Sequence, residues 1–233
     1  MSKQLWLVIL LGCASGPRSE PSPPPAHHGA MHRRFDHADE WAKVFDDPAR
    51  DAWQQPDRVL AALALGPRMT VADIGAGTGY FAVRLARAVP DGQVIATDIE
   101  ADMVRYLTER AAREGLHNLR AVQTPPADPQ LPADGVDRIL VVDVWHHLDD
   151  RASYARALAR GLRPGGRVAV VDFKASATHG PPAKHRLAPS EIAGDLQGAG
   201  LSVVVDESTL PEQYIVFGTR GSPAPASDAR AGS

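Results

Sequence analysis

Two hydrophobic patterns divide the chain, and the first lies before residue 70. Apolar residues recur every three or four positions around Trp41 and Phe45, and again between Pro56 and Leu63. This spacing predicts two amphipathic helices. The first is expected to end before Pro48, and in the second a proline suits the first turn.

From residue 71 on, short apolar runs alternate with segments of helical spacing. The run at 136–142 is almost entirely apolar, as expected for a strand that is covered on both faces. Strands that alternate with helices predict a mostly parallel sheet with right-handed crossovers. The expected strands are 71–74, 94–97, 119–122, 136–142, 168–171, 201–205 and 214–217, and the expected helices lie near 81–89, 103–111, 155–162 and 191–199.

The two ends of the sequence differ from its middle. Residues 14–30 are rich in Pro, Ser, Gly and Ala, and residues 221–233 are small and polar. Such segments bury too little apolar surface to order themselves, so we expect a tether over 13–31 and a disordered tail over 221–233. The folded domain is expected over 32–220. The histidines at 27, 28, 32 and 37 are interpreted as exposed side chains, and no metal site is expected.

The first residues have the layout of an export signal. Lys3 precedes the apolar run Leu5–Leu11, which is too short for a membrane-spanning helix of about 20 residues. Residues 10–13, Leu-Leu-Gly-Cys, resemble the lipobox of bacterial lipoproteins. The resemblance implies a signal peptide over 1–12, a lipid on Cys13 and a membrane-anchored protein that faces the periplasm. The alternative is a cytoplasmic protein whose translation starts near Met31.

Composition and charge exclude several classes of protein. The single cysteine rules out a disulfide within the chain. With 44% hydrophobic and 23% charged residues, the 233-residue chain is typical of a soluble globular domain. A net charge of −3 argues against a nucleic-acid partner that is held through phosphate contacts.

The strongest chemical signal follows the first expected strand. Residues 73–80 read Asp-Ile-Gly-Ala-Gly-Thr-Gly-Tyr, and glycines let the backbone turn sharply beside a ligand. Free N–H groups at the start of the next helix suit a nucleotide-like ligand. The dinucleotide fingerprint G-x-G-x-x-G is not met, because Tyr80 takes the place of its last glycine. Asp73 would repel a pyrophosphate but attract an ammonium group.

A second acid narrows the choice of ligand. Asp98 ends the second expected strand, where a carboxylate accepts hydrogen bonds from both ribose hydroxyls. An ammonium group, a ribose and no phosphate describe S-adenosylmethionine.

Four segments resemble the class I S-adenosylmethionine-dependent methyltransferases, in the order and spacing of that family. Residues 73–79 resemble its first motif and Asp98 its ribose-binding acid. Residues 142–148 resemble the segment after its fourth strand, and residues 162–166 the loop that enters its fifth. The resemblance implies an α/β, Rossmann-like sheet of seven mostly parallel strands with the last one antiparallel, helices on both faces and an N-terminal helical lid.

The resemblance also implies S-adenosylmethionine as the cofactor. Asp73 is expected to meet its ammonium group, Asp98 its ribose and Ile99 its adenine. The family often has a Gly-Asp pair after the third strand; residues 124–128 read Thr-Pro-Pro-Ala-Asp instead, so Asp128 is the candidate replacement. The expected cofactor-binding residues are Asp73, Gly75, Ala76, Gly77, Thr78, Gly79, Asp98, Ile99, Asp128 and Asp143.

The residues after the fourth expected strand are the catalytic candidates. Methyl transfer needs mainly alignment, and a base only where the acceptor must lose a proton. Asp143, His146 and His147 lie where the sheet opens toward the acceptor, and a histidine titrates near neutral pH. The alternative is structural, with one histidine turned inward and the other facing solvent.

Two further segments are candidates for the walls of the site. Residues 32–36 with Trp41, Phe45 and Trp53 are expected to form an aromatic lid, or simply to pack on the sheet. The basic residues 184–186 either meet an anionic substrate or form a solvated surface.

These features favour methyl transfer to a small molecule, since no dedicated nucleic-acid or protein-recognition domain is recognisable. The competing interpretation is an exported module that binds a nucleoside or metabolite without turnover, because S-adenosylmethionine is made in the cytoplasm. A nicotinamide oxidoreductase is disfavoured by Asp73 and Tyr80. The identity of the acceptor and the oligomeric state do not follow from the sequence.

Overall fold

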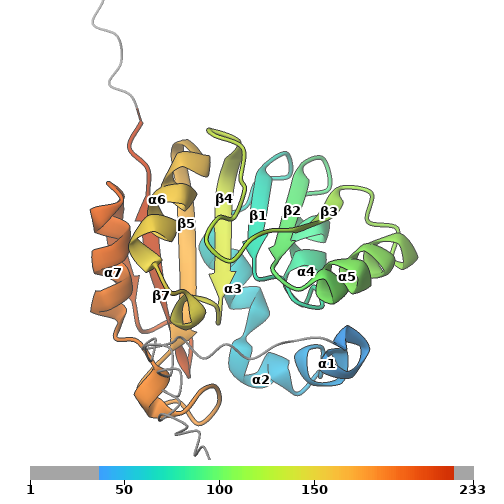
Figure 1. The fold of residues 1–233 in the computed structure, drawn as a ribbon, viewed down its shortest axis with the longest axis horizontal. Helices are drawn as coiled ribbons and strands as arrows, with labels where there is room; N and C mark the ends of the chain where they lie inside the picture. Colours follow the sequence, from blue (N-terminus) through green and yellow to red (C-terminus); the bar gives the residue numbers. More distant parts are fainter. Residues whose placement is uncertain (1–36, 223–233) are drawn as a thin grey trace, which may run out of the picture.

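The computed structural model describes residues 37–222, which form one seven-stranded sheet with helices on both faces (Figure 1). The strand order is β3-β2-β1-β4-β5-β7-β6. As expected, the last strand, β7, runs opposite to the others: it pairs antiparallel with both β5 and β6, and the remaining pairs are parallel. The strands are β1 (Thr70–Ile74), β2 (Gln93–Asp98), β3 (Leu119–Gln123), β4 (Val136–Val142), β5 (Leu162–Phe173), β6 (Ser202–Asp206) and β7 (Gln213–Thr219).

The helices divide between the two faces of the sheet because alternate strand residues point to opposite faces. Side chains such as Val71, Leu140 and Val171 pack on one face with α3 and α4, while Ala72, Val141 and Val170 pack on the other with α6 and α7. The helices are α1 (Ala38–Phe45), α2 (Arg50–Gln54), α3 (Pro56–Leu63), α4 (Ala82–Ala88), α5 (Ala101–Arg113), α6 (Arg151–Gly161) and α7 (Pro189–Gly198), and the 3₁₀ turns are η1 (Trp145–His147) and η2 (Ala183–His185).

The strand order places a topological switch point between β1 and β4. The chain goes from β1 outward to β2 and β3, then returns to the other side of β1 to form β4. The loops at the carboxyl ends of β1 and β4 therefore leave in opposite directions, which opens a crevice for ligands at that edge of the sheet. The glycine loop and the segment with His146 both lie at this edge.

Three details differ from the sequence-based expectation. Helix α2 was not expected, because its five residues are too few to show a periodic pattern. Helix α6 ends at Gly161, so Leu162 belongs to β5 and pairs with Val136 of β4. The Pro-Gly-Gly segment after it was expected to be a loop, but it lies within β5, where the register shifts between Val136 and Arg138. Glycines at this irregularity fit a β-bulge.

The expectations for both ends of the chain lie largely outside the described residues. This applies to the signal peptide, Cys13, the tether, the start near Met31 and nearly all of the tail. Within residues 37–222, the helices are all too short or too polar to cross a membrane.

Candidate active site

The glycine loop follows β1 and has a backbone that only glycine adopts readily. Gly75, Gly77 and Gly79 have φ angles of 69°, 54° and 96°. A Cβ on Gly75 would lie 2.4 Å from a methyl carbon of Val144, and one on Gly79 would lie 2.3 Å from a methyl carbon of Leu107. The loop is therefore fixed in shape by backbone conformation and by close packing.

Asp73 ends β1 beneath this loop with an unsatisfied oxygen. The residue is 3% exposed, and its Oδ2 has no hydrogen-bond partner among the described residues. Burial, with the nearby charge of Asp98, raises the pKa of Asp73 to about 7, although Arg50 acts in the opposite direction. A buried carboxylate oxygen without a partner is costly, and here it indicates a place for a donor group of a ligand.

Asp98 joins the end of β2 to the glycine loop. Its Oδ2 accepts a hydrogen bond from the N–H of Gly77 at 2.8 Å, and its Oδ1 accepts one from the N–H of Glu100 at 2.9 Å. Each carboxylate oxygen keeps a second lone pair for a ligand hydroxyl. The next residue, Ile99, is an exposed apolar side chain, 48% accessible.

Two other expected cofactor residues lie in different surroundings. Thr78 is buried, and its hydroxyl has no hydrogen-bond partner among the described residues. Asp128 is exposed, and its Oδ1 accepts a hydrogen bond from the N–H of Gln130 at 2.8 Å. Asp128 therefore caps its own loop, and a ligand would have to use its remaining acceptor capacity.

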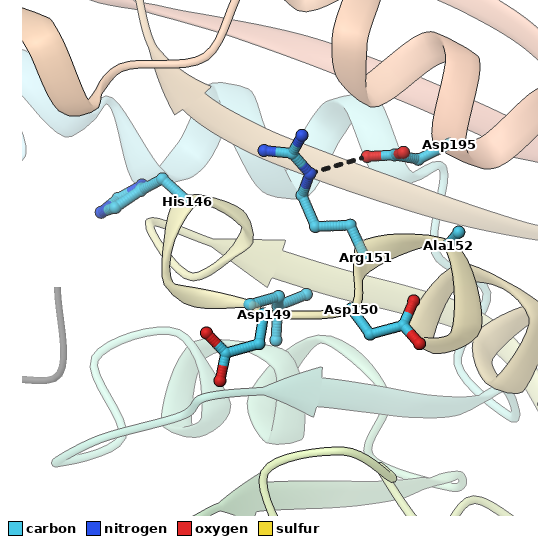
Figure 2. Close-up of a pocket in the computed structure, with 7 residues that line it drawn as sticks. His146, Asp149, Asp150, Arg151, Ala152 and Asp195 are labelled. Carbon is cyan, nitrogen blue, oxygen red and sulfur yellow. Dashed lines mark ion pairs between the residues drawn. The ribbon is translucent and has the colours of Figure 1, made fainter. Parts of the chain in front are cut away.

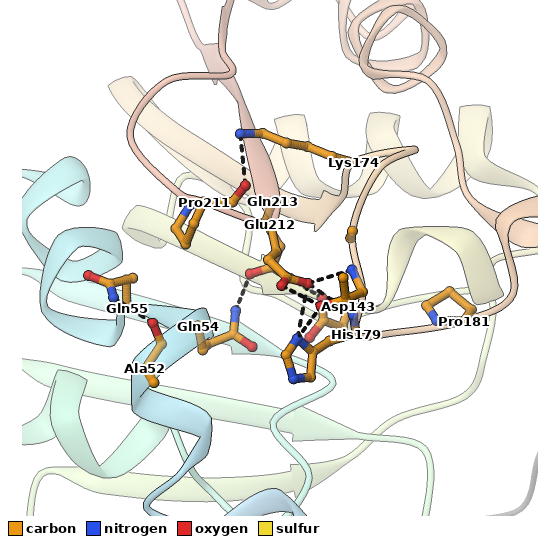
Figure 3. Close-up of polar contacts among 12 residues, drawn as sticks. Ala52, Gln54, Gln55, Asp143, Lys174, His179, Pro181, Pro211, Glu212 and Gln213 are labelled. Atoms are coloured by element: carbon orange, nitrogen blue, oxygen red, sulfur yellow. Dashed lines mark hydrogen bonds and ion pairs between the residues drawn. The ribbon is translucent and has the colours of Figure 1, made fainter.

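Asp143 follows β4 in a strained conformation that long-range contacts hold. Its φ is 59°, which is uncommon for a residue other than glycine. Its Oδ1 accepts a hydrogen bond from Gln213 Nε2 at 2.5 Å, and Gln213 in turn accepts one from Gln54 of α2 (Figure 3). Burial raises the pKa of Asp143 to about 7, against the opposing charge of Arg50.

Arg50 of α2 is a site residue that the sequence did not reveal. Its guanidinium lies 3.7 Å from Asp143 Oδ2 and 4.1 Å from the centre of the Tyr80 ring. It also donates to Gln54 Oε1 and to the carbonyl of Phe45. Because α2 is so short, only its tertiary contacts mark it as part of the site.

His146 lies in η1 and faces a carboxylate from the next strand. Its Nδ1 is 3.0 and 3.1 Å from the two oxygens of Asp172, which ends the apolar core of β5. The His146 side chain is 4% exposed and Asp172 is fully buried. Burial opposes protonation, but Asp172 and Asp143 outweigh it and raise the pKa of His146 above its ordinary value. Sequence reasoning missed Asp172, although an acid at the end of an apolar strand was the signal used for Asp73.

A hollow of about 480 Å³ lies beside His146 (Figure 2). Arg151 pairs across it with Asp195 at 3.2 Å. The lining residues are His146, Leu148, Asp149, Asp150, Arg151, Ala152 and Asp195.

The aromatic residues before β1 cover two different parts of the site. Phe45 stacks with Trp41 at 5.3 Å and lies close to Gly77, where an added Cβ would be 3.6 Å from its ring. Trp53 instead stacks on His179 at 4.8 Å, in the loop after β5. The lid is thus described for α1 and α2, while residues 32–36 lie outside the described part.

The expectation that all three basic residues at 184–186 face either substrate or solvent was wrong for Arg186. Its guanidinium donates hydrogen bonds to backbone carbonyls of the loop between β5 and η2, so it holds that loop together. Lys184 is exposed and His185 is half-buried. The carbonyls that Arg186 contacts belong to Lys174, Ala175, Ala177, His179 and Pro181.

Among residues 37–222, we find no cluster of His, Cys, Asp or Glu that could hold a metal.

The edge of the sheet thus offers a coherent set of partners. The unsatisfied Asp73 oxygen suits an ammonium group, Asp98 a pair of hydroxyls and Ile99 an aromatic ring. These are the polar and apolar parts of S-adenosylmethionine, so the residues present fit that cofactor.

Comparisons with known proteins agree with this fit. Residues 71–166 match a family described as a methyltransferase domain. The chain is 36% identical over 104 residues to the methyltransferase gedG of Aspergillus terreus, which covers 45% of this chain and 31% of that protein. It is 34% identical over 118 residues to an uncharacterized methyltransferase of Mycobacterium tuberculosis, which covers 50% and 57%. The matched part of the chain therefore spans only 31% to 57% of the length of these relatives.

A solved structure extends the likeness to most of the described residues. The S-adenosylmethionine-dependent methyltransferase of Aquifex aeolicus superposes with a TM-score of 0.71 at 29% identity, over 80% of this chain and 99% of that one. Residues 71–166 thus match a methyltransferase domain, and the described residues share the fold of an S-adenosylmethionine-dependent methyltransferase.

Proposed function

We propose that this protein transfers a methyl group to a small-molecule acceptor by in-line displacement. The observation that carries the proposal is the buried Asp73 oxygen without a partner, directly beneath the glycine loop. A buried carboxylate oxygen without a hydrogen-bond donor destabilises the fold, and an ammonium group of a ligand would supply that donor.

Each expected cofactor residue has a role in this proposal. Asp73 binds the ammonium group, Asp98 the ribose hydroxyls and Ile99 one face of the adenine. Asp128 serves the adenine amine through its free acceptor capacity, and Asp143 adds negative charge near the methionine end. The loop residues Gly75, Ala76, Gly77, Thr78 and Gly79 bring the backbone close to the ligand.

When bound, S-adenosylmethionine supplies a sulfonium methyl group whose carbon–sulfur bond breaks as the bond to the acceptor forms, with the electron pair left on sulfur. The protein's own residues orient the two partners and exclude water. Phe45 and Trp53 shield the site on the side of α1 and α2. The hollow of about 480 Å³ beside His146 is of the size that small-molecule sites have.

Calorimetry with S-adenosylmethionine and its demethylated product tests the cofactor part of the proposal. We expect both to bind, and a thermal-shift titration to show the stabilisation that mass action requires. Asp98→Ala should weaken both, whereas Asp91→Ala, in the exposed turn before β2, should not. If the folded protein binds neither compound, the proposal is wrong and a module without turnover becomes the better interpretation.

We also propose that Cys13 carries a lipid that anchors the protein on the periplasmic side of a bacterial membrane. The support is the Leu-Leu-Gly-Cys sequence at residues 10–13, behind an apolar run. Labelling with radioactive palmitate in cells should mark the wild type and not Cys13→Ser. Equal labelling of the two proteins, or none of the wild type, would leave a cytoplasmic protein that starts near Met31.

A further inference from the structure

The backbone position of His146 is fixed by its neighbour Trp145 and by the short connection to β4. Its neighbour Trp145 is fully buried and donates a hydrogen bond from Nε1 to Asp195 of α7 at 3.0 Å. The turn η1 follows β4 after only two residues, so its backbone moves with the sheet. The His146 imidazole therefore has little freedom to move to a hydrogen-bond partner other than Asp172.

The partner of His146 determines which of its nitrogens carries the proton. A carboxylate only accepts hydrogen bonds, so Nδ1, at 3.0 Å from Asp172, must be the protonated nitrogen. The lone pair of the neutral ring is then on Nε2, on the opposite side of the ring from Asp172. Asp172 is itself fixed, because its Oδ1 also accepts the N–H of Phe173 at 2.8 Å.

We infer that Asp172 is a positioning residue that presents His146 Nε2 as the general base for an acceptor whose nucleophilic atom carries a proton. This inference rests on the proposed function, since it concerns the acceptor side of the same site. The base that the sequence left open between two histidines is then His146. His147, which is half-exposed with its ring centre 4.3 Å from that of His146, is a neighbour and not the base.

The charges around His146 define the class of acceptor. The carboxylates of Asp143 and Asp172 lie beside it, and Asp149 and Asp150 line the hollow. The nearby cations are already engaged: Arg50 with Asp143, and Arg151 with Asp195. A phosphate or carboxylate on the acceptor would meet this negative surface, so the site favours a neutral acceptor.

Proton affinities narrow the class further. A thiol and a phenol have ordinary pKa values of about 8.5 and 10, close enough to imidazole for the proton to move as the new bond forms. We therefore expect a neutral phenolic hydroxyl or thiol. Its proton passes to Nε2, the electrons of its O–H or S–H bond form the bond to carbon, and the imidazolium paired with Asp172 later releases the proton to water.

The first test needs no acceptor. Imidazole ¹⁵N spectra of the protein alone, followed through a pH titration, should show His146 with a proton on Nδ1 and none on Nε2 in its neutral form. Asp172→Asn should lower the His146 pKa by about one unit and mix the two tautomers. His117, an exposed histidine at the opposite edge of the sheet, serves as the unchanged control. A neutral His146 protonated on Nε2, or a titration that is the same in Asp172→Asn, overturns the pairing.

The second test uses catechol and 2-mercaptoethanol as acceptors, and dimethyl sulfide as a neutral nucleophile without a proton. His146→Gln should lower kcat toward catechol about 100-fold and Asp172→Asn about 10-fold, with KM nearly constant. His147→Gln should lower it far less, and His117→Gln less than twofold. The rate should rise with pH through the His146 pKa, and that rise should move to lower pH in Asp172→Asn. Transfer to dimethyl sulfide, which has no proton to lose, should fall far less than transfer to catechol in both variants.

The outcomes separate this inference from the proposed function. Without cofactor binding in calorimetry, the proposed function fails, while the spectra still decide the pairing of His146 with Asp172. If the cofactor binds but methyl transfer occurs only to dimethyl sulfide, or to none of the probes, the acceptor class is wrong. A larger loss in His147→Gln than in His146→Gln assigns the base to His147.

Discussion

Four aspartates lie at the carboxyl ends of neighbouring strands, but the two on one side of the switch point are held differently from the two on the other. Asp98 accepts hydrogen bonds from backbone N–H groups of adjacent loops, and one oxygen of Asp73 has no partner among the described residues. Asp143 and Asp172 are bound by side chains from distant segments, namely Gln213 and His146. We call the first pair the cofactor side and the second pair the acceptor side of the site, with Asp143 also expected near the methionine end of the cofactor.

The difference suggests how the site separates cofactor binding, which depends on backbone contacts, from acceptor chemistry, which depends on side chains. On the cofactor side, acceptor capacity remains for a ligand, and the contacts come from the backbone, which most substitutions leave unchanged. On the acceptor side, α2, β4, β5 and β7 each contribute a side chain. One substitution there changes the chemistry offered to the acceptor while the cofactor side keeps its shape.

The largest expected effect is on the cofactor side, from Gly75→Val. A Cβ there meets Val144 at 2.4 Å and the φ of 69° is unfavourable, so we expect about 2–4 kcal/mol less stability in urea unfolding and loss of cofactor binding. Gly115→Ala separates the two causes. It has a φ of 66° but no atom within 4 Å, and should cost about 1 kcal/mol. Equal losses in both variants would show that the close packing of the loop is unimportant.

A pair of variants tests whether the two sides act independently. Asp98→Asn should weaken S-adenosylmethionine binding about 30-fold, because charge-assisted hydrogen bonds to the ribose are lost. Asp172→Asn should change it less than about twofold, and Asp128→Asn, at an exposed position, about threefold. Calorimetry measures all three. A strong loss of cofactor affinity in Asp172→Asn would contradict the division into two sides.

The pH dependence of stability, compared between wild type and Asp143→Asn, should isolate the contribution of Asp143 on the acceptor side; Asp73, whose pKa is also raised to about 7, is the same in both proteins. The folded-state pKa of Asp143 is about 7, above its ordinary value of 3.8, so the folded state holds a proton that the unfolded chain releases. This contribution to stability is complete below the ordinary pKa and is lost as the pH rises through about 7. Asp143→Asn should thus gain about 1–2 kcal/mol relative to wild type between about pH 5 and pH 8. Parallel wild-type and variant curves from urea unfolding would show that Asp143 is charged throughout.

The smallest expected effect concerns the contact between α2 and the loop after β5. Trp53→Ala removes its stacking on His179 and its contact with Phe173, which are worth about 0.5–1.5 kcal/mol. Urea unfolding should register this loss while cofactor affinity stays within about twofold, because Trp53 belongs to the acceptor side. A large drop in cofactor affinity would instead show that α1 and α2 act as one lid over both the cofactor side and the acceptor side.

The cofactor side was predictable because its residues are close together in the sequence. Strand β1, the glycines and Asp98 follow one another within about thirty positions, and each has a local reason for its type. The seven strands were found at nearly their observed positions for the same reason, since buried parallel strands are continuous apolar runs. The start of β5 was misplaced. The Pro-Gly-Gly segment predicted a loop, but Leu162 pairs with Val136 and the strand begins there.

On the acceptor side the sequence indicated Asp143 and His146, but their partners were decided by tertiary structure. Asp172, Arg50 and Gln213 have no shared sequence signal, and they meet because the strand order places β4 beside β5 and β5 beside β7. The sequence by itself determined the sheet, the cofactor loop and the acids that end β1 and β2, since local chain geometry dictates them. Which histidine faces a carboxylate, and which arginine faces Asp143, depended on packing between residues far apart in the sequence. His146 and Asp172 are 26 positions apart, and Arg50 and Asp143 are 93 positions apart. Only the folded chain brings such donors and acceptors close together.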